Sequence, residues 1–248
     1  MDGINDWIYP TTRIGDAVRF RPASLEVFYR LACDPWKEGG RTLLELCEER
    51  GMPMEELGRD LAGLAAPRAD SPWESLPAYF LIDFLTAEHR QLLHSDLPAF
   101  RRLLEMPFSE ASGGHLFRVL LKSFHRIHEK LSGHMQEEED RIFPAILRNE
   151  FILRRELPAG NGRGAAEPLL VSSQLNAREE ELAVELDRWT RSLGTEGILG
   201  GRPKAAEFAA EAMGRLERKI RAHGELERKR LYPIAARIED ELAGVHAG

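Results

Sequence analysis

One pattern occurs twice in this chain, at residues 134–144 and 223–233. Each copy has a histidine, a glutamate four residues later, and an aromatic-proline pair that starts five residues beyond the glutamate. The repeated side chains are His134 with Glu138 and His223 with Glu227. Residues four apart on a helix share one face, so each copy places an imidazole beside a carboxylate. This donor set suits iron, and also zinc or manganese, and two facing helices can enclose a metal pair bridged by the glutamates.

The neighbours of both pairs predict that they point into the protein core. Apolar residues share the helix face of each pair: Ile127, Leu131 and Ile142 around His134, and Leu216, Ile220 and Leu231 around His223. Burying a carboxylate without a partner is costly, and a bound metal removes that cost. The plainer interpretation is that the histidines are structural and the glutamates are solvated or paired with arginines. This interpretation would be preferred for one copy of the pattern, but two matching copies favour a metal site.

His89 is a third candidate ligand, because Ile82, Leu85 and Leu92 share its helix face. We expect the remaining histidines at the surface: His94, His115, His125, His128 and His246. The stretch 168–193 contains no histidine, and its polar candidates are Asn176, Glu179 and Glu180. The glutamates can ligate a metal through oxygen. Equally, they can serve only to favour the start of a helix through its dipole.

The sequence predicts an all-α protein, since no stretch alternates apolar and polar residues as a strand does. Four long helices are expected, the first kinked at Pro98, over residues 73–104, 114–149, 168–193 and 205–243. Glycine-rich loops are expected at 158–164 and 194–203. This order predicts an up-and-down four-helix bundle over residues 73–245, a fold that commonly holds metals between facing helices.

A small helical domain is expected ahead of the bundle, over residues 12–64. Its helices are predicted at 17–31, 42–50 and 54–64, with breaks at Gly39-Gly40 and at 51–53. Residues 65–77 are rich in proline, alanine and serine and are interpreted as a linker.

Charge and cysteine content narrow the class of protein. Lysines and arginines number 34 against 41 acids, a net charge of −7, which argues against general nucleic-acid binding. The basic run within residues 215–230 is interleaved with glutamates and is interpreted as a solvated helix face. We find no signal peptide and no apolar run long enough to cross a membrane. Two cysteines, Cys33 and Cys47, suit a reducing compartment, so we expect a cytoplasmic protein.

Several other site motifs are absent from the sequence. The order His-x-x-x-Glu differs from the Glu-x-x-His motif of ferritin-like bundles and from the His-Glu-x-x-His motif of zincin proteases. The chain also has no phosphate-binding glycine loop and no Cys-x-x-Cys pair.

Residues from about Ala78 to Leu242 resemble the hemerythrin-like (HHE cation-binding) family of di-iron four-helix bundles. The resemblance rests on Glu88-His89-Arg90 with Leu97-Pro98 and on the two repeated segments. The N-terminal unit resembles the small helical domain of the di-iron iron–sulfur cluster repair proteins. Its matching positions are Val18, Arg21-Pro22, Phe28, Gly39-Gly40, Thr42-Leu43 and Cys47.

The resemblance implies a non-haem di-iron centre with histidine ligands and two bridging glutamates. The family ligand positions fall on His89, His134, Glu138, His223 and Glu227. The family's third-helix histidine aligns near Asn176 and is missing here. A carboxylate substitute, an open site with bound water or a mononuclear centre are the alternatives. The adjacent cysteines of the repair proteins fall on Lys37 and Glu38, so thiol chemistry there is expected to be lost or altered.

Three kinds of function remain open at the level of sequence. The first is iron–sulfur cluster repair or defence against oxidative and nitrosative stress, with oxygen, peroxide or nitric oxide reacting at the iron pair, or iron passing to an iron–sulfur protein. The second is a module that binds or senses oxygen or nitric oxide. The third is a metal-free bundle that acts in protein interaction. Whether the chain is an enzyme is left open by all three.

Overall fold

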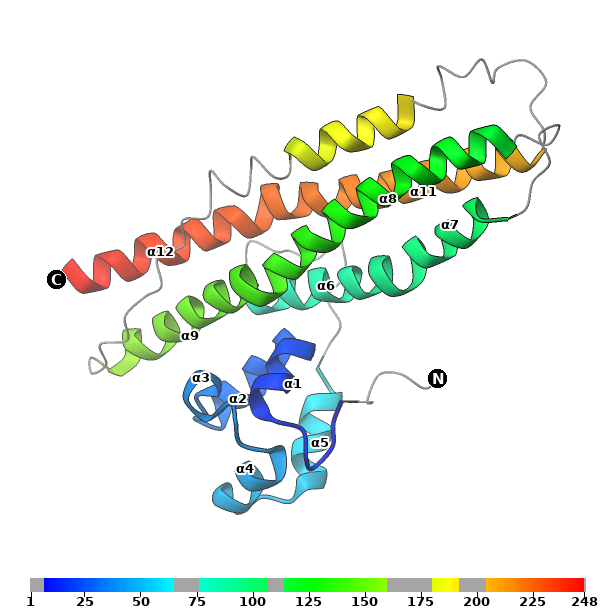
Figure 1. Cartoon of the computed structure of the whole chain (residues 1–248). Helices are drawn as coiled ribbons and strands as arrows, with labels where there is room; N and C mark the ends of the chain where they lie inside the picture. Colours follow the sequence, from blue (N-terminus) through cyan, green and yellow to red (C-terminus); the bar gives the residue numbers. More distant parts are fainter. Residues whose placement is uncertain (1–6, 65–75, 107–113, 160–179, 192–203, 248) are drawn as a thin grey trace. The chain divides into compact units, whose positions relative to one another are not determined.

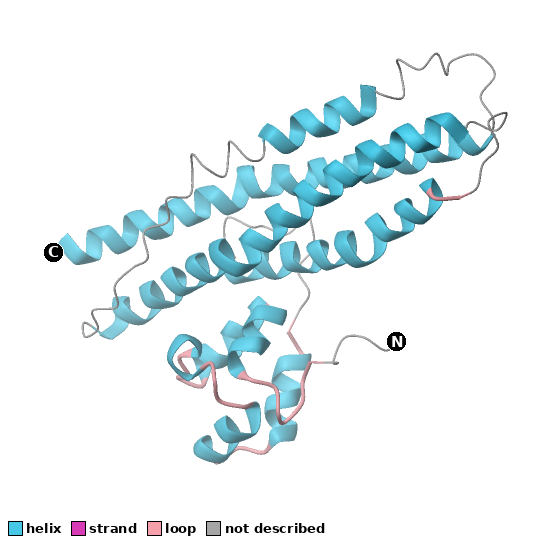
Figure 2. Cartoon of the chain, viewed as in Figure 1, coloured by secondary structure: helices cyan, strands magenta, loops and turns pink. Residues whose placement is uncertain are grey.

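The computed structural model describes residues 7–64, 76–106, 114–159, 180–191 and 204–247. Over these ranges the chain is all-helical and forms no strand, as predicted (Figures 1 and 2). An isolated antiparallel bridge joins Arg13 to Thr42. None of the helices in this described part has the length and apolarity that crossing a bilayer requires.

The chain divides into two compact units. The first is formed by the described residues of Met1–Thr86, Glu139–Leu169 and Pro233–Gly248. The second is formed by those of Ala87–Glu138 and Leu170–Tyr232. Each unit therefore draws on segments that lie far apart in the sequence.

The first unit begins with short helices. They are α1 (Ile14–Phe20), the 3₁₀ turn η1 (Pro22–Ser24), α2 (Leu25–Arg30), α3 (Pro35–Glu38), α4 (Leu43–Arg50) and α5 (Met54–Ala62). The single helix predicted over 17–31 is wrong, because Arg21 leaves helical geometry with φ −137° and ψ 84°. The residue before a proline is disfavoured in the α region, and here Pro22 follows Arg21.

The predicted helix over 42–50 is confirmed, and its ends follow local chemistry. Thr42 accepts a hydrogen bond from the backbone N–H of Glu45, whose side chain in turn accepts from the backbone N–H of Thr42. Gly51 ends the helix at φ 64°, a left-handed conformation that costs glycine little. The third predicted helix stops at Ala62, two residues before the predicted end.

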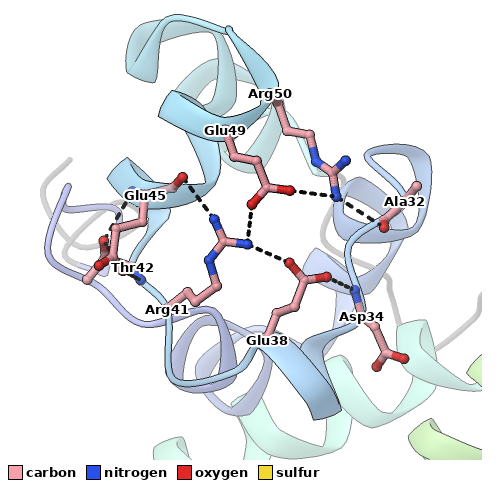
Figure 3. A network of polar contacts seen from close by, with 8 residues as sticks. All are labelled: Ala32, Asp34, Glu38, Arg41, Thr42, Glu45, Glu49 and Arg50. Carbon is pink, nitrogen blue, oxygen red and sulfur yellow. Dashed lines mark hydrogen bonds and ion pairs between the residues drawn. The ribbon is translucent and has the colours of Figure 1, made fainter.

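A polar network surrounds the turn that contains Glu38 (Figure 3). The carboxylate of Glu38 accepts hydrogen bonds of 2.8 Å from the backbone N–H of Asp34 and from the Arg41 guanidinium. Arg41 also pairs with Glu49 and donates to the carbonyl of Glu45 at 3.1 Å. Glu38, which the resemblance aligns with a cysteine of the family, therefore orders this turn.

Side-chain contacts within the first unit tie the short helices to α6 (Ala78–Gln91) and α9 (Phe143–Ala159). Arg21 Nε lies 2.8 and 3.0 Å from the two oxygens of the buried Asp83. Tyr29 donates to the carbonyl of Arg154 at 3.0 Å. Glu150 accepts from the first two backbone N–H groups of α6, at 2.9 and 3.3 Å. Residues 76 and 77 are not helical, so α6 starts later than the predicted Trp73.

In the second unit, residues from four helical segments share one apolar core. The segments are α7 (Leu97–Leu104) with the turn before it, α8 (Gly114–Glu137), a helix over 180–191 and α11 (Lys204–Leu226). The helix over 180–191 is buried through Leu182, Leu186 and Trp189, which recur at helical spacing. The Trp189 ring packs edge-on against Phe100, with centroids 5.4 Å apart.

Three π-helical turns interrupt the long helices that the structure describes, at η3 (Leu92–Asp96), η5 (Glu138–Ile142) and η6 (Glu227–Leu231). A proline follows each turn after one residue: Pro98, Pro144 and Pro233. Proline has no N–H for the carbonyl four residues earlier. The N–H groups of Leu97 and Tyr232 instead reach back five residues, to the carbonyls of Leu92 and Glu227. The predicted interruption at Pro98 is thus a π turn, a feature frequent at functional sites.

Helix boundaries differ from prediction at several points. The helix predicted to end at residue 149 continues through α9 to Ala159, because Phe151 and Leu153 extend its buried face. Pro158 and Ala159 are therefore helical and do not belong to the predicted loop, whose other residues lie outside the described ranges. The helix predicted over 205–243 is observed as α11, η6 and α12 (Tyr232–Ala247). Of the helix predicted over 168–193, only residues 180–191 are described.

Candidate metal centre

Five side chains from three helices meet in the second unit. They are His89 of α6, His134 of α8, Glu138 at the start of η5, His223 of α11 and Glu227 at the start of η6. Three of them have no exposed surface, His223 is 2% exposed and His134 is 8% exposed. The predicted inward faces are confirmed, since the six apolar neighbours named for His134 and His223 are buried as well.

Four of these residues lie close enough to share one ion. The Nε2 atoms of His89 and His223 are 3.0 Å apart. His223 Nε2 lies 2.8 Å from Glu227 Oε1, and His89 Nε2 lies 3.5 Å from Glu138 Oε2. One donor atom from each of the four residues lies within 4.8 Å of the others. Imidazole nitrogen and carboxylate oxygen together suit iron, zinc or manganese.

His134 approaches the same two glutamates. Its Nε2 atom lies 3.4 Å from Glu138 Oε2 and 3.8 Å from Glu227 Oε2. Both carboxylates therefore stand between imidazoles of different helices, an arrangement in which a carboxylate can contact two ions. All five side chains that the sequence predicted as ligands are brought together.

Glu88 is a site residue to which the sequence assigned no role. Its Oε2 atom lies 3.2 Å from His223 Nδ1, and its side chain is 24% exposed. A carboxylate on the second nitrogen of a histidine fixes the tautomer and directs the other nitrogen toward a metal. The signal in the sequence was an acid directly beside His89. Helical spacing gives no indication that this acid pairs with a histidine on α11.

Burial and charge set the protonation of the group. Neither oxygen of Glu138 accepts a hydrogen bond of normal geometry from the described residues. Burial first, and then the charge of Glu227, raise the pKa of Glu138 well above its ordinary value. Burial also acts to raise the pKa of Glu227, but His223 and His134 outweigh it, and that pKa lies well below its ordinary value. Burial opposes the charged form of His223, yet Glu227, Glu88 and Glu138 raise its pKa to about 10.

In the metal-free group these pKa shifts favour a protonated Glu138 beside an ion pair of Glu227 and His223. The two carboxylates and three imidazoles of this group are buried in the core, where unpaired charge is costly. A cation bound between them removes the repulsion between the two ionised carboxylates. On this ground the residues fit a metal.

The other candidates from the sequence are placed as follows. His94 and His125 are exposed, as predicted. His128 is only half-buried rather than fully at the surface, because it packs against the Phe124 ring at 5.8 Å, and this burial lowers its pKa. Glu180 is exposed at the start of the helix over 180–191. Asn176 and Glu179, and the side chains of His115 and His246, lie outside the described residues.

Fold and site together define a class: a protein that is helical over its described residues and whose buried histidines and glutamates can hold a metal ion. The chain is a distant homologue of the iron–sulfur cluster repair proteins, which confirms the resemblance seen in the sequence. It is 24% identical over 139 residues to "Iron-sulfur cluster repair protein YtfE" of Escherichia coli (strain K12 / DH10B), covering 56% of this chain and 63% of that protein. The same figures hold for the protein of that name from Shigella boydii serotype 18 (strain CDC 3083-94 / BS512). The chain thus spans somewhat under two thirds of the length of these relatives. No family model matches the chain.

Proposed function

We propose that this chain is a non-haem di-iron protein with the hemerythrin-like architecture. In this proposal residues 73–245 form an up-and-down four-helix bundle, and residues 12–64 form a small helical domain before it. The single observation that carries the proposal is the buried convergence of His89, His134, Glu138, His223 and Glu227 in one unit. Two carboxylates at 0% exposure need a cation to be ionised together.

The donor set supports two unequal metal positions. His89, His223 and the two glutamates supply a complete set for one ion. His134 and the same glutamates, acting as bridges, supply fewer donors for a second. We propose that the first position binds iron more tightly than the second. Asn176, Glu179 and Glu180 stay candidates for completing the second position.

The proposed role is in iron–sulfur cluster repair or in the response to oxidative and nitrosative stress. It is supported by the name of the relatives and by the donor set, which suits iron. A bound iron pair would supply redox chemistry toward oxygen, peroxide or nitric oxide, or iron for a damaged cluster in an iron–sulfur protein. The chain's own residues contribute by excluding water from the group, by orienting His223 through Glu88 and by holding a proton on Glu138 until metal binds.

Thiol chemistry is not part of this proposal. Glu38 occupies one of the positions of the family's cysteine pair and is engaged with Asp34 and Arg41. Cys33 is fully buried, and burial, then Glu38, raise the pKa of its thiol to about 12. A thiol of this kind is a poor nucleophile and a poor metal ligand.

Elemental analysis of protein purified without chelator, together with its optical spectrum, tests the proposal. Up to two irons per chain with oxo-bridged di-iron absorption is the expected result. The double variant Glu138→Gln/Glu227→Gln should take up no metal and keep its helical circular dichroism. The control His125→Ala changes an exposed histidine of the same helix and should bind metal normally. Metal content unaltered in the double variant would refute the assignment.

A further inference from the structure

A cavity of about 320 Å³ borders the metal group in the second unit. One face of α8 and the helix over 180–191 line it, through Lys130, Gly133, His134, Glu137, Glu181 and Leu182. We infer that this cavity is the route by which a divalent cation enters and leaves the group. The inference rests on the proposed function and adds to it a path and a gating position.

His134 connects the cavity with the buried group. It is the most exposed of the five candidate ligands, at 8%, whereas the other four lie between 0% and 2%. Its Nε2 atom is 3.4 Å from Glu138 Oε2, and the residue is also among those that line the cavity. An ion that reaches His134 from the cavity is therefore already beside a carboxylate of the site.

The size of the cavity suits a hydrated ion. An octahedral divalent cation carries six water molecules in its first shell. At about 30 Å³ each, these waters occupy about 180 Å³. The cavity volume of about 320 Å³ exceeds that requirement. The ion can thus arrive hydrated and lose its waters only where His134 and the glutamates replace them.

The charges around the cavity favour a cation. Glu137 and Glu181 contribute two negative charges and Lys130 one positive charge. Lys130 lies 3.5 Å from Glu181, and these side chains are 43% and 72% exposed. An exposed ion pair of this kind contributes little to stability and separates readily. The pair can therefore open without disturbing the fold.

Gly133 is the position at which the route can be closed. A Cβ atom built on Gly133 would meet nothing within 4 Å, so a larger side chain there has room in the cavity. Gly244 of α12, in the first unit, is also helical, exposed and free of neighbours within 4 Å of a Cβ. It provides a matched control, since leucine raises helix propensity at either position.

The experiment compares Gly133→Leu with Gly244→Leu. Metal-loaded protein is mixed with an excess of a coloured ferrous chelator to follow release, and metal-free protein is mixed with ferrous iron to follow uptake. A closed route changes both rates by the same factor and leaves the equilibrium unchanged. We expect Gly133→Leu to slow both processes by about tenfold or more with metal content unaltered. Gly244→Leu should match the wild type.

Equal rates in the two leucine variants would overturn the route. If Gly133→Leu fails to fold, Gly133→Ala replaces it, with an expected slowing that is smaller but still greater than that of Gly244→Ala. Equal rates in this second pair would overturn the route as well. A wild-type chain that takes up no iron would instead refute the proposed function, and the route with it.

Discussion

The Oε2 atom of Glu88 lies 3.2 Å from the Nδ1 atom of His223 on another helix. Two adjacent residues of α6 thus act on the same imidazole, because the Nε2 atom of His89 lies 3.0 Å from Nε2 of His223. The contact with Glu88 orients the His223 ring. The His89 ring lies beside the Nε2 atom of His223, among the candidate ligands. The candidate metal centre therefore includes a contact from a residue that need not bind a metal itself.

Removing this contact should weaken metal binding. For Glu88→Ala we expect the metal affinity to fall about ten- to one-hundredfold, with the helical fold kept. Glu88→Gln should retain most of the affinity, since its amide oxygen can still accept from Nδ1–H. Competition with a chelator of known affinity provides the measurement. Glu129→Ala removes an exposed glutamate of α8 and serves as the control. Equal affinities in the two alanine variants would show that Glu88 has no orienting role.

The two glutamates should differ in how they affect the stability of the metal-free protein. Glu138→Gln replaces a carboxyl whose raised pKa favours the neutral form, so we expect a cost of about 1 kcal/mol or less. Glu227→Gln leaves protonated His223 buried without its partner, and we expect a cost of about 3 kcal/mol. Denaturant unfolding in the presence of chelator measures both.

The pH of that measurement follows from the pKa shifts. The pKa of Glu227 is lowered, so its contribution is complete above the ordinary value of 4.5 and is lost as the pH falls. The pKa of His223 is raised to about 10, so its contribution is complete below the ordinary value of 6.5 and is lost as the pH rises toward 10. The difference between the two variants should be largest between these ordinary values and shrink in alkaline solution. Equal costs at pH 6 would contradict the assignment of the ion pair.

Much of the candidate site could be predicted because it depends on helical periodicity. The spacing of His134 to Glu138 and of His223 to Glu227 fixes a common face, and the apolar residues on that face fix its direction. The spacing and the apolar face are enough to predict that these side chains lie in the core. They apply equally to His89, which the structure places beside His223.

What could not be predicted depends on contacts between elements. The break at Arg21 has a local cause in the proline that follows it, but the contact of the Arg21 side chain with Asp83, far away in the sequence, follows from no spacing rule. Glu88 pairs across helices, and no spacing rule reports such a pair. The π turns follow from the combination of a proline with a tertiary packing that accepts the wider turn.

Cys33, one of the two buried cysteines of the first unit, should be unreactive in the native protein. The pKa of Cys33 is about 12, so about one thiol in ten thousand is ionised at pH 8. Iodoacetamide at pH 8, followed by mass spectrometry, should label Cys33 in denaturant and leave it almost unlabelled without denaturant. Cys47, whose pKa is also raised by burial, should behave in the same direction. Fast labelling of Cys33 without denaturant would contradict this prediction, and thiol chemistry would then have to be included in the proposed function.

Metal binding should release protons, and its apparent affinity should therefore rise with pH. In the metal-free group His223 is protonated below about pH 10, and Glu138 keeps its proton above the ordinary range of a glutamate. A metal ligated by both residues displaces one proton from each. While both protons are present, the apparent affinity should rise by about one hundredfold per pH unit, a factor of ten for each proton.

Calorimetric titration of the metal-free protein with ferrous iron, in buffers of different ionisation enthalpy, counts these protons directly. The expected number approaches two while Glu138 and His223 are both protonated and falls as rising pH removes either proton before the metal binds. His125→Ala should give the wild-type number, since the exposed His125 ring lies outside the group. A count of zero at neutral pH would mean that neither residue gives up a proton to the metal. The ion would then be bound somewhere other than between His223 and Glu138.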